Sequence, residues 1–141
     1  MSERAKEYLN TQNFNRYDAL ASYLLAQSYD KRGMREDAIR AYNNVFGGFT
    51  GYILVSAPAV KRIMELTWER GRSAEGEGKS DQQTAYEFGW NYIDSTDHIV
   101  SQMKDEEKMQ WDQVQVLVQQ YEDDPGVMKM EEVKKLRQQG R

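Results

Sequence analysis

The chain has 141 residues, of which 39% are hydrophobic and 30% charged, a composition typical of one soluble globular domain. The 19 Lys and Arg residues against 23 Asp and Glu residues give a net charge of −4, which argues against nucleic-acid binding, because phosphate contacts need a basic surface. The sequence has no cysteine and one histidine, which excludes disulfide frameworks, cysteine-containing metal sites and thiolate nucleophiles. We expect no cofactor, no metal and no membrane insertion. No secretory signal follows Met1, so the cytoplasm is the default compartment unless the sequence is a fragment of an exported protein.

The first predicted elements are two helices, over residues 17–32 and 34–45. Apolar residues recur at helical spacing in both segments. Gly33 separates them and can end the first helix in the left-handed conformation that glycine adopts easily. Because the linker is so short, we expect the two helices to pack antiparallel.

The Gly-Gly pair at 47–48 is predicted to end the second helix. The apolar, β-branched segment that follows fits a short strand or an ordered loop, and we favour the loop because no second strand exists to pair with it. Ser56 is the expected N-cap of a third helix over residues 57–70, with Pro58 in its first turn. The glycine-rich segment 71–80 is predicted to be an exposed, mobile loop.

Asp81 is the expected N-cap of a fourth helix. The helical period over residues 81–104 fits either one helix or two helices divided near residues 94–95. A further helix is predicted at about 105–121, followed by a polar helix or tail over 125–141. The sequence therefore predicts an all-α protein.

The first helix pair has small and aromatic residues at the spacing of a close helix crossing. Ala26 and Ala38 are small where the two backbones approach, and Tyr29 and Tyr42 fill the space beside them. In order and spacing, residues 17–46 resemble the tetratricopeptide repeat (TPR) family. The residues predicted to pack the repeats are Leu25, Ala26, Tyr29, Gly33, Ala38, Tyr42 and Ala85.

Weaker copies of this pattern lie on either side of the first pair. Residues 1–9 resemble the second helix of an earlier repeat, and residues 57–93 resemble a degenerate repeat into which the loop 71–80 is inserted. The resemblance implies antiparallel helix pairs stacked as a short right-handed superhelix in a single domain over residues 1–124. The helices of residues 96–122 would then cap the stack, because short helical repeats cannot bury their apolar faces alone.

In this family, the first helix of each pair lines a concave surface that binds peptides. The resemblance therefore implies a non-enzymatic scaffold that binds a protein or peptide partner. The alternative is a structural segment of a larger helical-repeat protein, or a homo-oligomer formed through the exposed first repeat and the helix that carries Trp111 and Tyr121. The candidate groove residues are Tyr23, Gln27, Asp30, Lys31, Lys61 and Glu65.

Two features could indicate nucleotide binding or catalysis, and both are incomplete. Residues 76–80 end like a phosphate-binding loop, but Ser73 stands where the first glycine is required, and a helix precedes it instead of a strand. His98 lies beside acidic residues with no nucleophile nearby, which is typical of a surface histidine. We therefore expect no enzyme activity and no catalytic residues.

Overall fold

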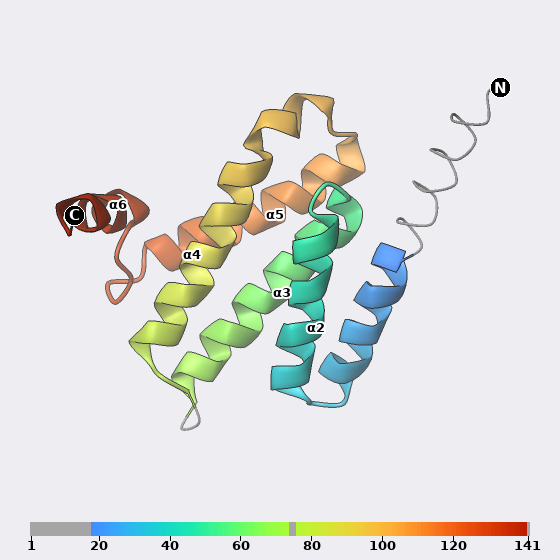
Figure 1. The fold of residues 1–141 in the computed structure, drawn as a ribbon, viewed down its shortest axis with the longest axis horizontal. Helices are drawn as coiled ribbons and strands as arrows, with labels where there is room; N and C mark the ends of the chain where they lie inside the picture. Colours follow the sequence, from blue (N-terminus) through green and yellow to red (C-terminus); the bar gives the residue numbers. More distant parts are fainter. Residues whose placement is uncertain (1–17, 74–75, 141) are drawn as a thin grey trace.

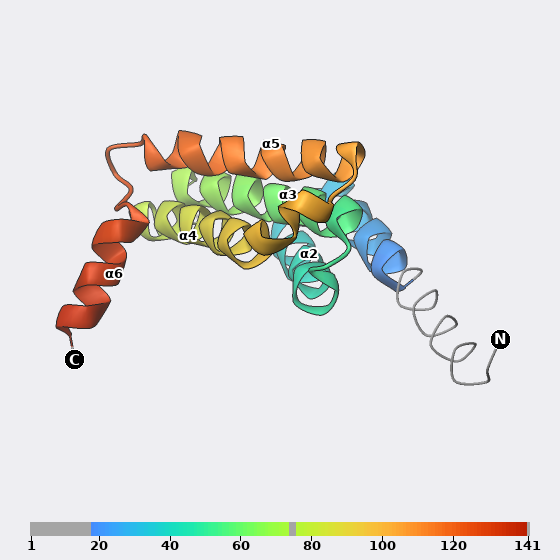
Figure 2. The same ribbon diagram turned by 90° about the horizontal axis from the view of Figure 1, so that it is seen from above.

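The computed structural model describes residues 18–73 and 76–140, and every regular element within these ranges is a helix. The predicted all-α class is confirmed for this part of the chain. Successive helices between residues 18 and 122 alternate in direction, with the helix over residues 18–31 at one edge of the described part, whereas the last helix, at the other edge, runs across them (Figure 1 and Figure 2). The core therefore forms where neighbouring helices pack side by side.

The helix over residues 18–31 and α2 (Arg35–Phe49) form the first antiparallel pair. Gly33 lies between them with φ of +73°, a conformation that costs glycine no steric strain, and it ends the first helix as predicted. Ala26 and Ala38 are fully buried in one apolar cluster. The small side chains thus lie where the two helices of the pair are packed together.

Leu25 does not pack in this pair, contrary to its predicted role. It exposes 54% of its surface, whereas Ile63, its counterpart in the second copy of the pattern, exposes 4%. Ile63 is buried in the cluster that α2 and α3 share, whereas the outward side of helix 18–31 has no described helix against it. The half-repeat predicted over residues 1–9 lies outside the described residues.

The connection from α2 to α3 (Ile53–Arg72) differs from the prediction, because the Gly-Gly pair at 47–48 does not end α2. Glycine costs about 1 kcal/mol within a helix. Here Val45 is fully buried and the Phe46 ring packs 4.8 Å from another phenylalanine ring, so packing outweighs that cost. The apolar segment expected as a loop or strand instead forms the start of α3, and Pro58 lies inside that helix.

Ser56 is therefore not an N-cap but a buried residue of α3. Its hydroxyl donates a hydrogen bond to the Thr50 carbonyl at 2.9 Å and lies 2.7 Å from the Tyr92 hydroxyl. These contacts join the start of α3 to α4. A serine before a proline has the sequence pattern of a helix cap, but here it is an internal polar contact.

The described part of the glycine-rich segment, before α4 (Lys79–Thr96), is anchored to both flanking helices. Arg70 donates a hydrogen bond to the Asp81 carboxylate at 2.9 Å, and the Glu77 backbone N–H donates to the same carboxylate at 2.8 Å. A Cβ at Gly76 would collide with the Arg70 carbonyl, so only glycine fits there. The loop is shorter than the predicted segment 71–80, because α3 continues to Arg72 and α4 begins at Lys79, and Glu77 within it is exposed as expected. Asp81 is buried in the first turn of α4 and is not its N-cap.

Neither of the two open alternatives for residues 81–104 holds in full, because the helix does not divide at residues 94–95 and does not stay α-helical to its end. α4 runs unbroken through residues 94–95 and passes at Thr96 into a 3₁₀ helix, η1 (Asp97–Gln102). The Thr96 hydroxyl lies 2.7 Å from the Tyr92 carbonyl and accepts the Trp111 indole N–H at 2.8 Å. The end of α4 is thus hydrogen-bonded to the next helix.

α5 (Asp105–Glu122) packs against both α3 and α4. Figure 2 shows α5 as an outer layer over α3. α3 is the central helix, because it also packs against α2 and α4. The buried stripe of α5 comprises Trp111, Val114, Val118 and Tyr121.

α6 (Met130–Gln139) lies at the far edge and is tied to α4 through polar contacts. The Tyr86 hydroxyl donates to Glu122 and accepts the Met130 backbone N–H, both at 2.9 Å. The Gln83 side-chain amide pairs with the Met128 backbone in both directions, at 2.9 and 2.7 Å. The C-terminal helix is thus attached to the α4 side of the molecule.

Candidate peptide-binding groove

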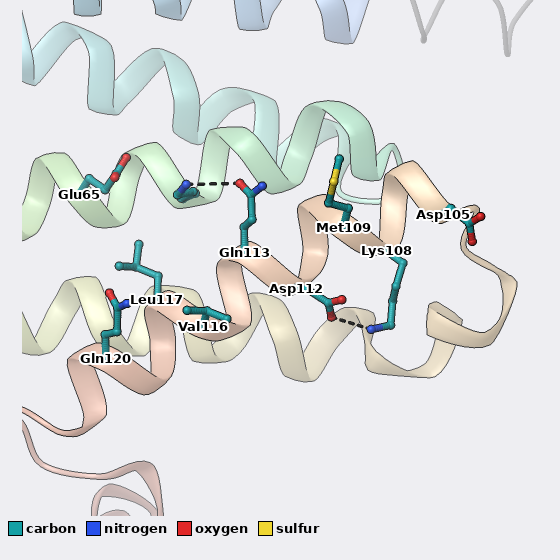
Figure 3. A pocket seen from close by; sticks show the side chains of 10 residues that line it. Glu65, Asp105, Lys108, Met109, Asp112, Gln113, Val116, Leu117 and Gln120 are labelled. Atoms are coloured by element: carbon teal, nitrogen blue, oxygen red, sulfur yellow. Dashed lines mark hydrogen bonds and ion pairs between the residues drawn. The ribbon is translucent and has the colours of Figure 1, made fainter.

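A groove of about 660 Å³ lies between α3 and α5 (Figure 3). Lys61 and Glu65 line it from α3, while Met109 and Val116 are among the residues that line it from α5. Met109 exposes 54% and Val116 55% of its surface. The groove therefore presents accessible apolar side chains next to charged ones.

The groove exists because α5 is apolar on two faces. Trp111, Val114 and Val118 face the core and are buried. Met109 and Val116 fall outside this stripe and stay exposed. The inner face fixes α5 against α3 and α4, so the outer apolar residues are held on a rigid support.

Both lysines of the groove are engaged by neighbouring side chains. Lys108 lies 2.6 Å from the Asp112 carboxylate, one helical turn along α5. Lys61 donates a hydrogen bond to the Gln113 side-chain oxygen at 3.3 Å, which bridges α3 and α5 (Figure 3). Neither cation is therefore left as an isolated charge in the groove.

The acidic residues outnumber the lysines, so the lining carries a net charge of −1, from two lysines against three acids. Asp105 makes no ion pair among the residues that the structure describes. Glu65 lies 3.6 Å from Arg62, whose guanidinium already forms a two-pronged ion pair with Asp30. The groove thus favours a ligand that carries a positive group.

Two of the six predicted groove residues, Lys61 and Glu65, line this groove. The other four lie on helix 18–31 and do not line it. Tyr23 packs against Tyr42 with ring centres 5.8 Å apart, and burial raises its pKa. The four residues that lie elsewhere are Tyr23, Gln27, Asp30 and Lys31.

Asp30 joins three helices and is not a free groove residue. Its carboxylate accepts two hydrogen bonds from Arg62 of α3, at 2.6 and 3.0 Å, and one from the Tyr42 hydroxyl of α2 at 3.0 Å. The hydrogen bonds from Arg62 hold the pKa of Asp30 below its usual value. This aspartate therefore contributes to the packing of helix 18–31 against α2 and α3.

We expect Asp30→Ala to reduce the free energy of unfolding by about 1–3 kcal/mol, because it leaves a guanidinium and a largely buried hydroxyl without their acceptor. Urea denaturation at pH 7 measures this loss. Asp37→Ala is the control, since the Asp37 pair with Arg40 is exposed, with 3.7 Å between charged atoms; it should cost less than about 1 kcal/mol. Equal losses for both variants would contradict the assigned role of Asp30.

The α5 side of the groove was not predicted, because this helix was expected to cap the stack or to contact a second copy of the chain. The available signal was a second apolar face, with Met109 and Val116 outside the Trp111 stripe. Trp111 and Tyr121 themselves do not contribute to the outer surface of the helix that carries them. Both are buried, and Tyr121 stacks on Trp68 with ring centres 4.0 Å apart.

Further properties of the described residues bear on the class of site. They contain no group of three or more His, Asp or Glu side chains that could hold a metal ion. No helix in the described ranges is both long and apolar enough to span a bilayer. Comparisons with protein-family models, curated proteins and solved structures find no match. The function is therefore argued from the groove itself.

Proposed function

We propose that the chain is a non-enzymatic, tetratricopeptide-like interaction module that binds a protein or peptide partner in the groove between α3 and α5. The order of the helices supports this proposal. Helix 18–31 pairs with α2, α3 pairs with α4, and α5 follows. In a right-handed superhelix, the first helices of successive pairs line one face, and α5 would extend that face beyond α3.

The observation that carries the proposal is the accessible apolar surface of Met109 and Val116 beside hydrogen-bonding groups of Lys61 and Gln113. Covering apolar surface contributes about 25 cal/mol for each Å² removed from water. Polar groups at the rim fix the orientation of the ligand. This combination is typical of a binding surface.

A second hollow of about 450 Å³ lies at the start of α3 and, like the groove, is lined by residues of both α3 and α5. It is lined by Leu20 and Leu54, which are both exposed, and by Lys104 and Glu107 at the start of α5. From Leu54 to Glu65, α3 rises about 16 Å, which matches about five residues of an extended peptide. This part of α3 is therefore long enough to lie along a short linear segment.

The chemistry of the groove indicates what kind of segment binds. Met109 and Val116 need apolar side chains opposite them, and Glu65 and Asp105 favour a basic residue beside those anchors. The proposed ligand is therefore a segment with apolar anchors flanked by Lys or Arg. It requires neither a cofactor nor a covalent step.

The test is selection of peptides from a random display library on the immobilised full chain. Selected peptides should be enriched in apolar residues next to Lys or Arg. Fluorescence anisotropy should then show that Val116→Arg weakens binding of these peptides at least tenfold, because it places a bulky cation on the apolar floor.

Leu136→Arg is the matched control, since Leu136 exposes 54% of its surface on α6, away from the groove. It makes a similar chemical change at an equally exposed site and should leave the affinity unchanged. Circular dichroism checks that both variants are folded. Equal affinities of the two variants, or enrichment of acidic peptides, would show that the groove is not the binding site.

A further inference from the structure

Helix 18–31 lies next to α2 at one edge of the described helices (Figure 1) and carries exposed leucines. Leu24 and Leu25 each expose more than half of their surface, and the neighbouring Ala21 and Ser28 are exposed as well. Adjacent exposed leucines on a helix are costly in water unless another surface covers them. This face is distinct from the groove between α3 and α5.

The counterpart of this face in the second copy of the repeat pattern indicates what kind of element fits it. Ile63 of α3 is the counterpart of Leu25, and it is buried in the cluster that α2 and α3 form. The same position on helix 18–31 therefore fits a packed helix. A short helix with small residues beside its leucines permits such close packing.

We infer that a second copy of this chain covers the face, through antiparallel packing of the two 18–31 helices about a two-fold axis. With the axis between Leu24 and Leu25, Leu24 of each copy lies opposite Leu25 of the other copy. Ala21 then lies opposite Ser28, so small residues meet where the backbones approach. A two-fold interface is self-complementary, and this helix face fulfils that condition.

The charges at the ends of the helix agree with the same arrangement. Asp18 and Lys31 are both exposed, near opposite ends of the helix. Antiparallel packing about that axis places Asp18 of each copy opposite Lys31 of the other, which gives two oppositely charged contacts. Parallel packing would place like charges together. Charge therefore specifies the orientation, while the leucines supply the apolar contact.

The first experiment is sedimentation equilibrium of the full chain from about 1 µM to about 1 mM, because a single short helix pair makes a weak dimer. Every sample contains the full chain, so the samples differ only at the substituted residue. The apparent mass should rise from 16.5 kDa towards twice that value. Asp18→Lys and Lys31→Glu should each weaken association at least tenfold.

Two control variants make the same charge changes elsewhere. Asp123→Lys alters an exposed residue directly after α5, and Lys135→Glu alters an exposed residue of α6. Neither residue lies on helix 18–31, so association should match that of the unaltered chain. These controls separate the local contact from the effect of net charge.

The decisive experiment mixes Asp18→Lys with Lys31→Glu in equal amounts. In a mixed dimer, one contact pairs the new lysine with the new glutamate, and the other retains Lys31 with Asp18. Native mass spectrometry should therefore detect a mixed dimer although neither variant associates alone. This result shows that both positions lie in the contact, and the antiparallel register is tested by the unaltered chain, in which parallel packing would place like charges together.

A chain that stays monomeric over the whole concentration range would overturn the inference, as would a mixture that associates no better than its components. Thermal unfolding of Leu25→Ser adds a further criterion. If the unaltered chain is monomeric and this variant melts at lower temperature, another segment of the same chain covers the face, and the inference is wrong. Peptide binding in the groove does not depend on any of these outcomes.

Discussion

Replacing Trp111 with alanine should lower the free energy of unfolding by about 3–5 kcal/mol, the range for deleting a large buried aromatic side chain. Trp111 exposes only 3% of its surface and lies in the main apolar cluster. Its indole N–H donates to the Thr96 hydroxyl at 2.8 Å. The variant therefore loses both apolar packing and the hydrogen bond between α5 and the end of α4.

Two further variants divide this effect into its parts. Trp111→Phe keeps most of the apolar ring but loses the indole donor, and should cost less than the alanine variant, by at least about 1 kcal/mol. Val116→Ala removes exposed surface from the same helix and should change stability by no more than about 0.5 kcal/mol. Urea denaturation measures all three. A loss below about 1 kcal/mol for Trp111→Ala would contradict the packing of α5.

Trp111→Ala also tests the relation between packing and the groove. α5 is one wall of the groove, and Trp111 holds its inner face. Peptides selected on the unaltered chain should bind this variant more weakly even where it remains folded, because Met109 and Val116 are no longer held firmly against α3.

The features predictable from the sequence were those set by local chemistry. Gly33 ends the first helix because its left-handed conformation is a property of glycine itself. The stripe of Trp111 and Tyr121 is buried because helical periodicity places these residues on one face. The glycine and the apolar periodicity both lie within the helix end or the helix whose structure they predict.

The errors arose where distant packing decided the outcome. Residues 47–48 stay helical because neighbouring α2 residues are packed into the core, and Ser56 is internal because Tyr92 lies beside it. Asp30 was predicted to face a ligand, but its carboxylate accepts two hydrogen bonds from Arg62 of α3. The sequence pattern around Asp30 contains no mark of that partner.

The groove was predictable only on its α3 side. Lys61 and Glu65 follow from the first-helix position of a repeat, whereas Met109 and Val116 depend on how α5 packs across α3. One strong apolar stripe already accounts for the packing of a helix against a core. The two apolar residues on its second face therefore give no separate signal in the sequence. Only the three-dimensional arrangement shows that this face adjoins α3.

Replacing Asp81 with alanine is the second change for which we expect a large effect, a loss of about 3 kcal/mol, because it removes the buried partner of Arg70 and leaves the Glu77 backbone N–H without its acceptor. Arg70 lies 2.9 Å from the buried Asp81 carboxylate, and the Glu77 backbone N–H lies 2.8 Å from it. Burial by itself would raise the pKa of Asp81, but the hydrogen bonds from Arg70 and Glu77 outweigh it and lower the pKa. Asp81 therefore stabilises the fold in its charged form.

The lowered pKa of Asp81 also predicts a pH dependence. The stabilisation is present above the unfolded-state pKa of about 4 and is lost as the pH falls through the lower folded-state value. Urea denaturation between about pH 2 and pH 7 should therefore show a shallower acid-side decline for Asp81→Asn than for the unaltered chain. Equal slopes for the two proteins would contradict a charged Asp81 in the folded state.

Glu36 provides the matched control for Asp81, because it also accepts hydrogen bonds from Arg70, at 2.9 and 3.1 Å. Its side chain is 61% exposed, whereas that of Asp81 is 8% exposed. Glu36→Gln should therefore cost less than about 1 kcal/mol, since water can replace the lost contact. If Glu36→Gln and Asp81→Asn lowered stability equally, the contribution would come from the charge on Arg70 and not from its buried partner. Both variants neutralise one carboxylate that contacts the Arg70 guanidinium. A clear difference between them would therefore assign the anchoring of the α3–α4 turn to Asp81.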